Sequence, residues 1–164
     1  MNEHIQREVE MSFAPLEGGC FCRAVRYTLT AAALSVQHCH CETCRKLSAS
    51  LSHPGAVCPR EAITIHGQES LKQIRTSPSF ERHFCSGCGC HLFGYEESEP
   101  RLMYFLPATL DGGAHPGHPA DKESHIYVRS KAPWERMADS LPQYLTTSPD
   151  EIITEQQKAE ILNY

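Results

Sequence analysis

Nine cysteines in 164 residues constrain this chain more than any other feature. They fall at Cys20, Cys22, Cys39, Cys41, Cys44, Cys58, Cys85, Cys88 and Cys90. An odd number cannot all pair within one chain, and the first ten residues, MNEHIQREVE, are charged where a secretory leader has an apolar run. Because reducing compartments keep thiols reduced, we expect a cytoplasmic protein whose cysteines bind metal instead of forming disulfides.

Composition excludes several classes of protein. The hydrophobic share is 40% and the charged share 21%, as in ordinary globular proteins and unlike disordered chains. The net charge is −5 and no run of Lys and Arg is present, so we expect no nucleic-acid partner. The longest strongly apolar stretch, Leu102–Leu106, ends at Pro107. It is far shorter than the roughly 20 residues that span a bilayer, so we expect no membrane partner.

The pattern along the chain predicts a mainly β protein with one late helix. Alternating or apolar segments predict strands at 23–29, 35–41, 62–65, 80–84, 91–95, 101–106 and 124–129. Glycine and proline predict a loop over 111–121, and three prolines make 130–149 mostly irregular. We expect a single domain over 1–164, with a loose N-terminus at 1–12 and a short helical tail at 149–164.

One set of cysteines has the spacing of a closed metal site. Cys20 and Cys22 are two apart and would share a face in an extended segment. Cys85 and Cys88 flank Ser86–Gly87, and the glycines there suit a sharp knuckle with positive φ. Four thiolates in a tetrahedral arrangement are typical of structural zinc. The alternative is four buried free cysteines that pack as small hydrophobic groups.

A second set lies in one hexapeptide, CHCETC. Cys39, Cys41 and Cys44 can converge there, and no fourth cysteine has a paired spacing with them. Three protein ligands and one exchangeable position are the pattern of catalytic zinc. The alternative is a closed site, which would be completed by one of four residues elsewhere: Cys58, Cys90, His40 or His91.

Four motifs then appear in a recognisable order: GGCFCRAVRY, HCHCETCRK, FCSGCGCHLF and HIYVRSKAPWERMADSLPQY. Together they closely resemble the glutathione-dependent formaldehyde-activating enzyme family, which also includes centromere protein V-like proteins. The resemblance spans residues 18–144. Three positions depart from the family pattern. Arg23 replaces a glycine, Ser48-Ala49-Ser50 replaces a stretch that commonly contains glycine, and Cys90 replaces a threonine or serine.

The resemblance implies a β-tent fold and two zinc ions per chain. It assigns Cys20, Cys22, Cys85 and Cys88 to the structural zinc, and Cys39, Cys41 and Cys44 to the catalytic zinc. It also implies addition of glutathione to formaldehyde, which is a carbon–sulfur lyase reaction when written in reverse. Metal coordination would supply a thiolate at neutral pH, and the thiolate would add to a carbonyl carbon.

Other residues have candidate roles at such a site. His125 is the first candidate for the proton donor, and its alternative is a hydrogen-bonded structural histidine. Arg45 and Lys46 are candidates for holding a substrate carboxylate, and their alternative is a solvated face. Trp134 is a candidate for lining a pocket, and its alternative is a place in the core. The expected partner is a small thiol such as glutathione or its adduct. The competing hypotheses are a non-catalytic zinc module that binds other proteins, and a metal-poor thiol redox protein. His115 and His118, in the predicted loop, are expected to be exposed.

Overall fold

The computed structural model describes residues 13–149, and these residues form ten strands, one short helix and several single 3₁₀ turns. The single α-helix is α1, Glu42–Ser48. The strands, in chain order, are β1 Leu16–Gly19, β2 Arg26–Leu29, β3 Ser35–Cys39, β4 His53–Pro59, β5 Ile63–His66, β6 Leu71–Arg75, β7 Phe80–Cys85, β8 His91–Glu96, β9 Leu102–Phe105 and β10 Glu123–Ile126. The prediction of a mainly β protein is confirmed.

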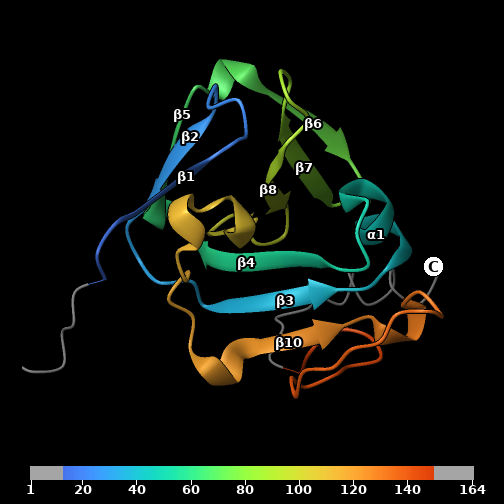
Figure 1. Ribbon diagram of the computed structural model, residues 1–164. Helices are drawn as coiled ribbons and strands as arrows, with labels where there is room; N and C mark the ends of the chain where they lie inside the picture. The colour runs from blue at the N-terminus through green and yellow to red at the C-terminus, as the bar shows by residue number, and fades with distance from the viewer. Residues whose placement is uncertain (1–12, 150–164) are drawn as a thin grey trace, which may run out of the picture.

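The strands form two sheets that enclose a wedge of core. The smaller sheet has the order β1-β2-β5, and the larger has the order β10-β3-β4-β9-β8-β7-β6. Neighbouring strands pair antiparallel except β10 and β3, which are parallel. In Figure 1 the smaller sheet forms one slope, β6, β7 and β8 form the other, and β4, β3 and β10 form the base. This is the tent-like arrangement that the resemblance implies.

The core lies between the slopes and is built from aromatic rings of both sheets. Tyr27 of β2 packs edge-on against Phe93 of β8 and Phe105 of β9, with ring centroids 5.4 and 6.1 Å apart. All three residues have no exposed surface. The hydroxyl of Tyr27 is hydrogen-bonded to Thr109 Oγ1 at 2.9 Å, so burial leaves no polar atom unpaired on this side chain. These contacts bind the two sheets into one hydrophobic cluster.

Each predicted strand has a counterpart, but several are shorter than expected. The segment 124–129 is extended only as far as Ile126, because Tyr127 adopts the left-handed conformation with φ 56°. His125 and Tyr127 therefore do not share one face of a strand. The segment 35–41 leaves the sheet at Cys39, since α1 begins at Glu42.

Three strands and α1 were not predicted. β1 contains two glycines, β4 contains Pro54 and Gly55, and β6 is an exposed edge strand. Such residues are poor strand formers, and an exposed edge has no buried face to show alternation. The predicted helical tail lies outside the described residues, apart from its first residue, Pro149. Within 13–149, no helix has the length and apolar character to cross a membrane.

Candidate functional site

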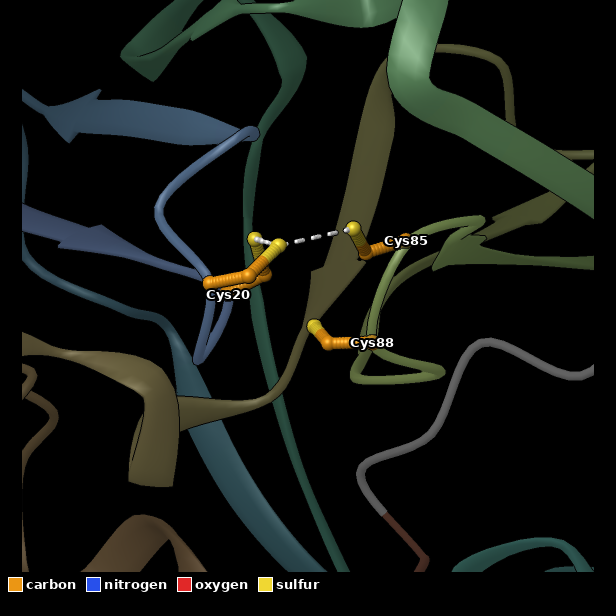
Figure 2. A group of neighbouring side chains, drawn as sticks. Cys20, Cys85 and Cys88 are labelled. Carbon is orange, nitrogen blue, oxygen red and sulfur yellow. Dashed lines mark hydrogen bonds between the residues drawn. The ribbon is translucent and has the colours of Figure 1, made fainter.

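The first cysteine cluster joins the two sheets at one point. Cys20 and Cys22 lie in the turn that links β1 to β2, and Cys85 ends β7 just before the turn that holds Cys88. Figure 2 shows Cys20 facing Cys85 and Cys88 from the opposite segment. The predicted grouping is therefore reproduced, although for a different reason. Cys20 and Cys22 meet through a tight turn, in which Arg23 N donates to Cys20 O at 3.0 Å, and not through strand alternation.

The spacing of the sulfurs in this cluster fits a tetrahedral metal ion. All four Sγ atoms lie within 4.8 Å of one another, and Cys22 Sγ is 3.6 Å from both Cys20 Sγ and Cys85 Sγ. Zinc–sulfur bonds of about 2.3 Å would set sulfurs about 3.8 Å apart in a tetrahedron. Val25 N–H also donates to Cys20 Sγ at 3.3 Å. Backbone N–H groups of Cys22 and Cys90 lower the pKa of Cys88 to about 6, which favours its thiolate.

The backbone around this cluster uses two positive φ angles. Gly89 has φ 72°, as the glycine pattern of the knuckle predicts. Arg23 has φ 65°, in the region that only glycine adopts without strain. This is the position where the family pattern has glycine. The turn therefore keeps the glycine conformation even though the residue is arginine.

The second cluster is local and lies at the end of β3. Cys39 ends that strand, Cys41 is the N-cap of α1, and Cys44 lies in its first turn. Cys44 N–H donates to Cys41 Sγ at 3.4 Å, so the thiol takes the capping role that serine or aspartate has in other helices. The three Sγ atoms lie within 4.8 Å of one another. A short helix that begins inside the motif thus brings the three predicted ligands together.

The charges of this cluster favour a cation at its centre. Hydrogen bonds from Cys39 and Cys44 lower the pKa of Cys41 to about 2, whereas hydrogen bonds with Cys41 and Cys44 raise the pKa of Cys39. One thiolate therefore forms at the expense of its neighbours unless positive charge is supplied. Among residues 13–149, no fourth His, Cys, Asp or Glu joins the group. The four proposed closing residues, Cys58, Cys90, His40 and His91, are thus not among the clustered ligands.

Positive charge approaches this cluster from β7. Arg82 Nη2 donates to Cys44 Sγ at 3.1 Å, and Arg82 Nη1 donates to His53 Nε2 at 3.3 Å. Because arginine is only a donor, His53 accepts through Nε2 and carries its proton on Nδ1. Burial, helped by the Arg82 charge, lowers the pKa of His53 to about 3. Burial and Arg82 also lower the pKa of His91, whose ring centroid is 5.0 Å from that of His53, to about 4.

A histidine–carboxylate chain lies beside the same motif. His40 has no exposed surface, and its ring bonds Glu135 Oε2 through Nδ1 (2.9 Å) and His125 Nδ1 through Nε2 (2.8 Å). His125 Nε2 in turn contacts Asp139 Oδ2 at 3.0 Å. Both ring nitrogens of His125 are thus engaged, and none of the cysteines is its partner. These hydrogen bonds fix the ring of His40, which lies between Cys39 and Cys41 in the sequence.

The predicted substrate contacts differ in exposure. Arg45 donates from Nε to His40 O at 3.3 Å, whereas Lys46 is paired with Glu42 on the surface of α1. Trp134 is 73% exposed, so it lies outside the core. His115 is exposed as expected, but the expectation for His118 is wrong. His118 is 7% exposed because it stacks on His115 and contacts Glu123 Oε2 at 3.2 Å.

Sequence reasoning missed several residues of this region. Arg82 and His53 lie on β7 and β4, and Glu135 and Asp139 lie in an irregular segment. No local spacing marks these four, because each meets its partner through long-range pairing. The one available indication was the charged residue Arg82 in a strand that leads directly into Cys85.

The fold and the two clusters define a class of β protein with two groups of cysteines that could hold metal ions, one of four residues and one of three. Both groups are compatible with zinc. Residues 15–130 match the family model of the glutathione-dependent formaldehyde-activating enzyme. The chain belongs to this family.

Named relatives agree with this placement, and one solved structure shares the fold. A Halomonas elongata protein with the provisional name glutathione-dependent formaldehyde-activating enzyme is 29% identical over 85% of this chain and 92% of its own length. A Penicillium rubens protein with the same provisional name is 28% identical over 64% of this chain and 68% of its own length. A crystal structure of a Rhodobacter sphaeroides protein covers 59% of this chain and 89% of its own, with 23% identity and a TM-score of 0.50. That likeness concerns the fold alone.

Proposed function

We propose that this protein is a zinc enzyme that joins the thiol of glutathione to formaldehyde, and that it binds two zinc ions per chain. The observation that supports this proposal most is the contrast between the two clusters. Four thiols surround one position, whereas three thiols with no fourth side-chain ligand among the described residues surround the other. Three ligands leave one coordination position for a substrate. The names of the relatives supply the thiol and the aldehyde.

In this proposal the residues divide into two sites. Cys20, Cys22, Cys85 and Cys88 hold a structural zinc ion that ties the sheets together. Cys39, Cys41 and Cys44 hold the catalytic zinc ion. A zinc ion bound there would favour the thiolate form of a substrate thiol at neutral pH, because zinc prefers sulfur and stabilises its anion.

The proposed reaction forms one carbon–sulfur bond. The thiolate sulfur adds to the carbonyl carbon of formaldehyde, the π electrons move to oxygen, and oxygen takes up a proton to give the S-hydroxymethyl product. The reverse direction is a carbon–sulfur lyase reaction. His125 stays our candidate for the proton donor. Since both its ring nitrogens are already hydrogen-bonded, donation to a substrate requires the bond to His40 or to Asp139 to open.

Substrate contacts are proposed on the helix and the segment beside it. Arg45 and Lys46 of α1 are proposed to hold the carboxylates of glutathione, and exposed Trp134 to flank them. A cytoplasmic location is part of the proposal, supported by the free state of every cysteine within the described residues.

The test combines metal analysis with product detection. Purified protein is expected to hold two zinc ions, one of which a chelator removes more readily. With glutathione and ¹³C-formaldehyde, the wild type should accelerate formation of the S-hydroxymethyl carbon signal in NMR exchange spectra, and Cys41→Ser should not. A protein with two zinc ions that neither binds thiol nor changes the exchange rate would overturn the enzyme proposal and favour a zinc-dependent protein-binding module.

A further inference from the structure

We propose that Arg82 balances the charge of the three-cysteine cluster so that this site accepts an anionic sulfur ligand in its open position. This inference deepens the proposed function and rests on it. The starting point is electrostatic. Zinc with three thiolates has a net charge of −1, and a fourth thiolate makes it −2. Without a nearby cation, such a site would favour a neutral ligand over a second negative charge.

Arg82 is placed to offset that charge. Its Nη2 donates to Cys44 Sγ at 3.1 Å, which puts the guanidinium in direct contact with the ligand set. Within residues 13–149 it has no carboxylate partner; its other contacts are Thr76 Oγ1, His53 Nε2 and the face of the Phe80 ring. All three of these partners are neutral. Its positive charge is therefore directed to the cysteines instead of being neutralised by an acidic residue.

The surroundings of Arg82 keep it in this place. Thr76 accepts from Nε at 3.2 Å, and the guanidinium lies 5.0 Å from the centroid of the Phe80 ring. Both contacts orient the planar fork, so its charge is held in one position before a ligand arrives. His53 is 6% exposed and accepts from Nη1, so a buried side chain holds the guanidinium at a second nitrogen besides the Nη2 that contacts Cys44. Arg82 is thus a positioning residue that acts on the substrate through the ligand charge.

Two kinds of fourth ligand should depend differently on Arg82. A thiolate brings a negative charge, so its affinity should depend on Arg82. Imidazole is neutral and should bind with little dependence on Arg82. A purely structural role for Arg82 would weaken both ligands equally. The ratio of the two affinities therefore isolates the charge effect from any general loosening of the cluster.

The experiment uses full-length protein loaded with cobalt(II), whose absorption changes when a ligand enters the open position. Each variant is titrated with 2-mercaptoethanol, which has no carboxylate, and separately with imidazole. Arg82→Gln should weaken thiol binding by about tenfold or more, the scale of a charge-assisted contact, and imidazole binding by less than about twofold. Arg82→Lys keeps the charge and should retain most of the preference for thiol. Arg101→Gln, which removes a charge from an exposed side chain, serves as the matched control.

Contrary results are distinguishable. Equal thiol affinity in the wild type and Arg82→Gln, or an equal loss for both ligands, would overturn the role of Arg82 and leave the proposed function standing. If Arg82→Gln does not fold, loss of the thiol preference in Arg82→Lys would overturn it instead. If the wild type binds no thiol at all, the proposed function itself fails and this inference fails with it.

Discussion

The two cysteine clusters are built from the same side chain but on different length scales. The four-cysteine cluster joins two turns, and its hydrogen-bonded pair Cys22 and Cys85 is separated by 63 residues. The three-cysteine cluster takes all its thiols from the hexapeptide between Cys39 and Cys44. A metal ion in the first would close a long loop, while one in the second would restrain only a short segment. We therefore expect the first cluster to contribute more to stability than the second.

One strand connects the two clusters. β7 ends at Cys85 of the four-cysteine cluster and also supplies Arg82, which contacts Cys44 of the three-cysteine cluster. Damage to the first cluster should therefore displace a residue of the second. Damage to the second should leave the first in place, because Cys39, Cys41 and Cys44 are not part of the hydrophobic cluster that joins the two sheets. The dependence runs in one direction, and mutations can test it.

The largest effect is expected from Cys85→Ser. This residue has no exposed surface, and its loss would open the proposed metal tie between the sheets. We expect a loss of stability above about 5 kcal/mol, which is comparable to the total stability of a small domain, and therefore an unfolded chain. Circular dichroism during urea titration, together with metal content, measures this. Cys90→Ser, at a neighbouring thiol outside the cluster, should fold. A cooperatively folded Cys85→Ser protein would remove the distinction between the clusters.

Cys41→Ser should have the opposite profile. Serine is a good N-cap, so its hydroxyl can still accept from Cys44 N–H and α1 should persist. We expect unfolding free energy within about 1 kcal/mol of the wild type, one zinc ion per chain instead of two, and activity reduced more than about 100-fold. Urea unfolding, metal analysis and the NMR exchange assay give the three values. Unfolding of Cys41→Ser to the same extent as Cys85→Ser would show that both clusters are structural.

Much of this division was predictable, because the spacing of cysteines is a local property. The spacing within Cys20/Cys22 and within Cys85/Cys88 predicts that the two thiols of each pair lie close together. It does not by itself predict that the two pairs meet. The joining of the two pairs followed from counting ligands. The seven predicted strands were found because their apolar residues alternate or form buried runs. A group of three thiols was predicted for the second cluster because no fourth cysteine has a paired spacing with Cys39, Cys41 and Cys44.

What could not be predicted depends on register between distant segments. β4 was missed because Pro54 and Gly55 disfavour a strand, although β3 and β9 hold it on both sides. α1 is too short for a helical repeat to show. The contact of Arg82 with Cys44 requires the order of strands in the larger sheet, which no local pattern contains. The residues around the two cysteine clusters were therefore harder to find than the cysteines themselves.

Acid should lower the free energy of unfolding through His53, which lies beside the three-cysteine cluster and its contact residue Arg82. The pKa of His53 is lowered to about 3 in the folded protein by burial and by Arg82, from an ordinary value of about 6.5. The unfolded chain therefore takes up a proton that the folded chain refuses. The contribution of neutral His53 to the free energy of unfolding is fully present above about pH 6.5 and is lost as the pH falls toward 3. At pH 5 this group alone accounts for up to about 2 kcal/mol.

Replacing His53 by Gln should remove this dependence. Urea unfolding at pH 7 and pH 5 should show a smaller loss for His53→Gln than for the wild type, while metal release on acidification acts on both and cancels in the difference. His66→Gln, at an exposed histidine of β5, should keep the wild-type loss. Identical losses in the wild type and in His53→Gln would show that His53 is not held neutral beside Arg82.

The smallest effects are expected at two strained turns, one beside each cluster. Arg23 has φ 65° next to the four-cysteine cluster, and Ala49 has φ 49° at the C-cap of α1. A left-handed residue other than glycine costs about 1–2 kcal/mol, and glycine loses about 0.4–1 kcal/mol through the greater entropy of its unfolded state. Each single change to glycine should therefore raise the unfolding free energy by about 0.5–1 kcal/mol.

The two glycine variants separate the clusters by their effects on metal. Arg23→Gly should slow chelator removal of the tightly held ion, because the turn that presents Cys20 and Cys22 becomes unstrained. Ala49→Gly should slow removal only of the readily chelated ion, since Cys41 and Cys44, the two cysteines that α1 positions, both belong to the three-cysteine cluster. Stopped-flow metal release with a coloured chelator resolves the two phases. If either variant slows both phases of metal release equally, the two clusters are coupled, with β7 as the connecting strand, and behave as one cooperative unit.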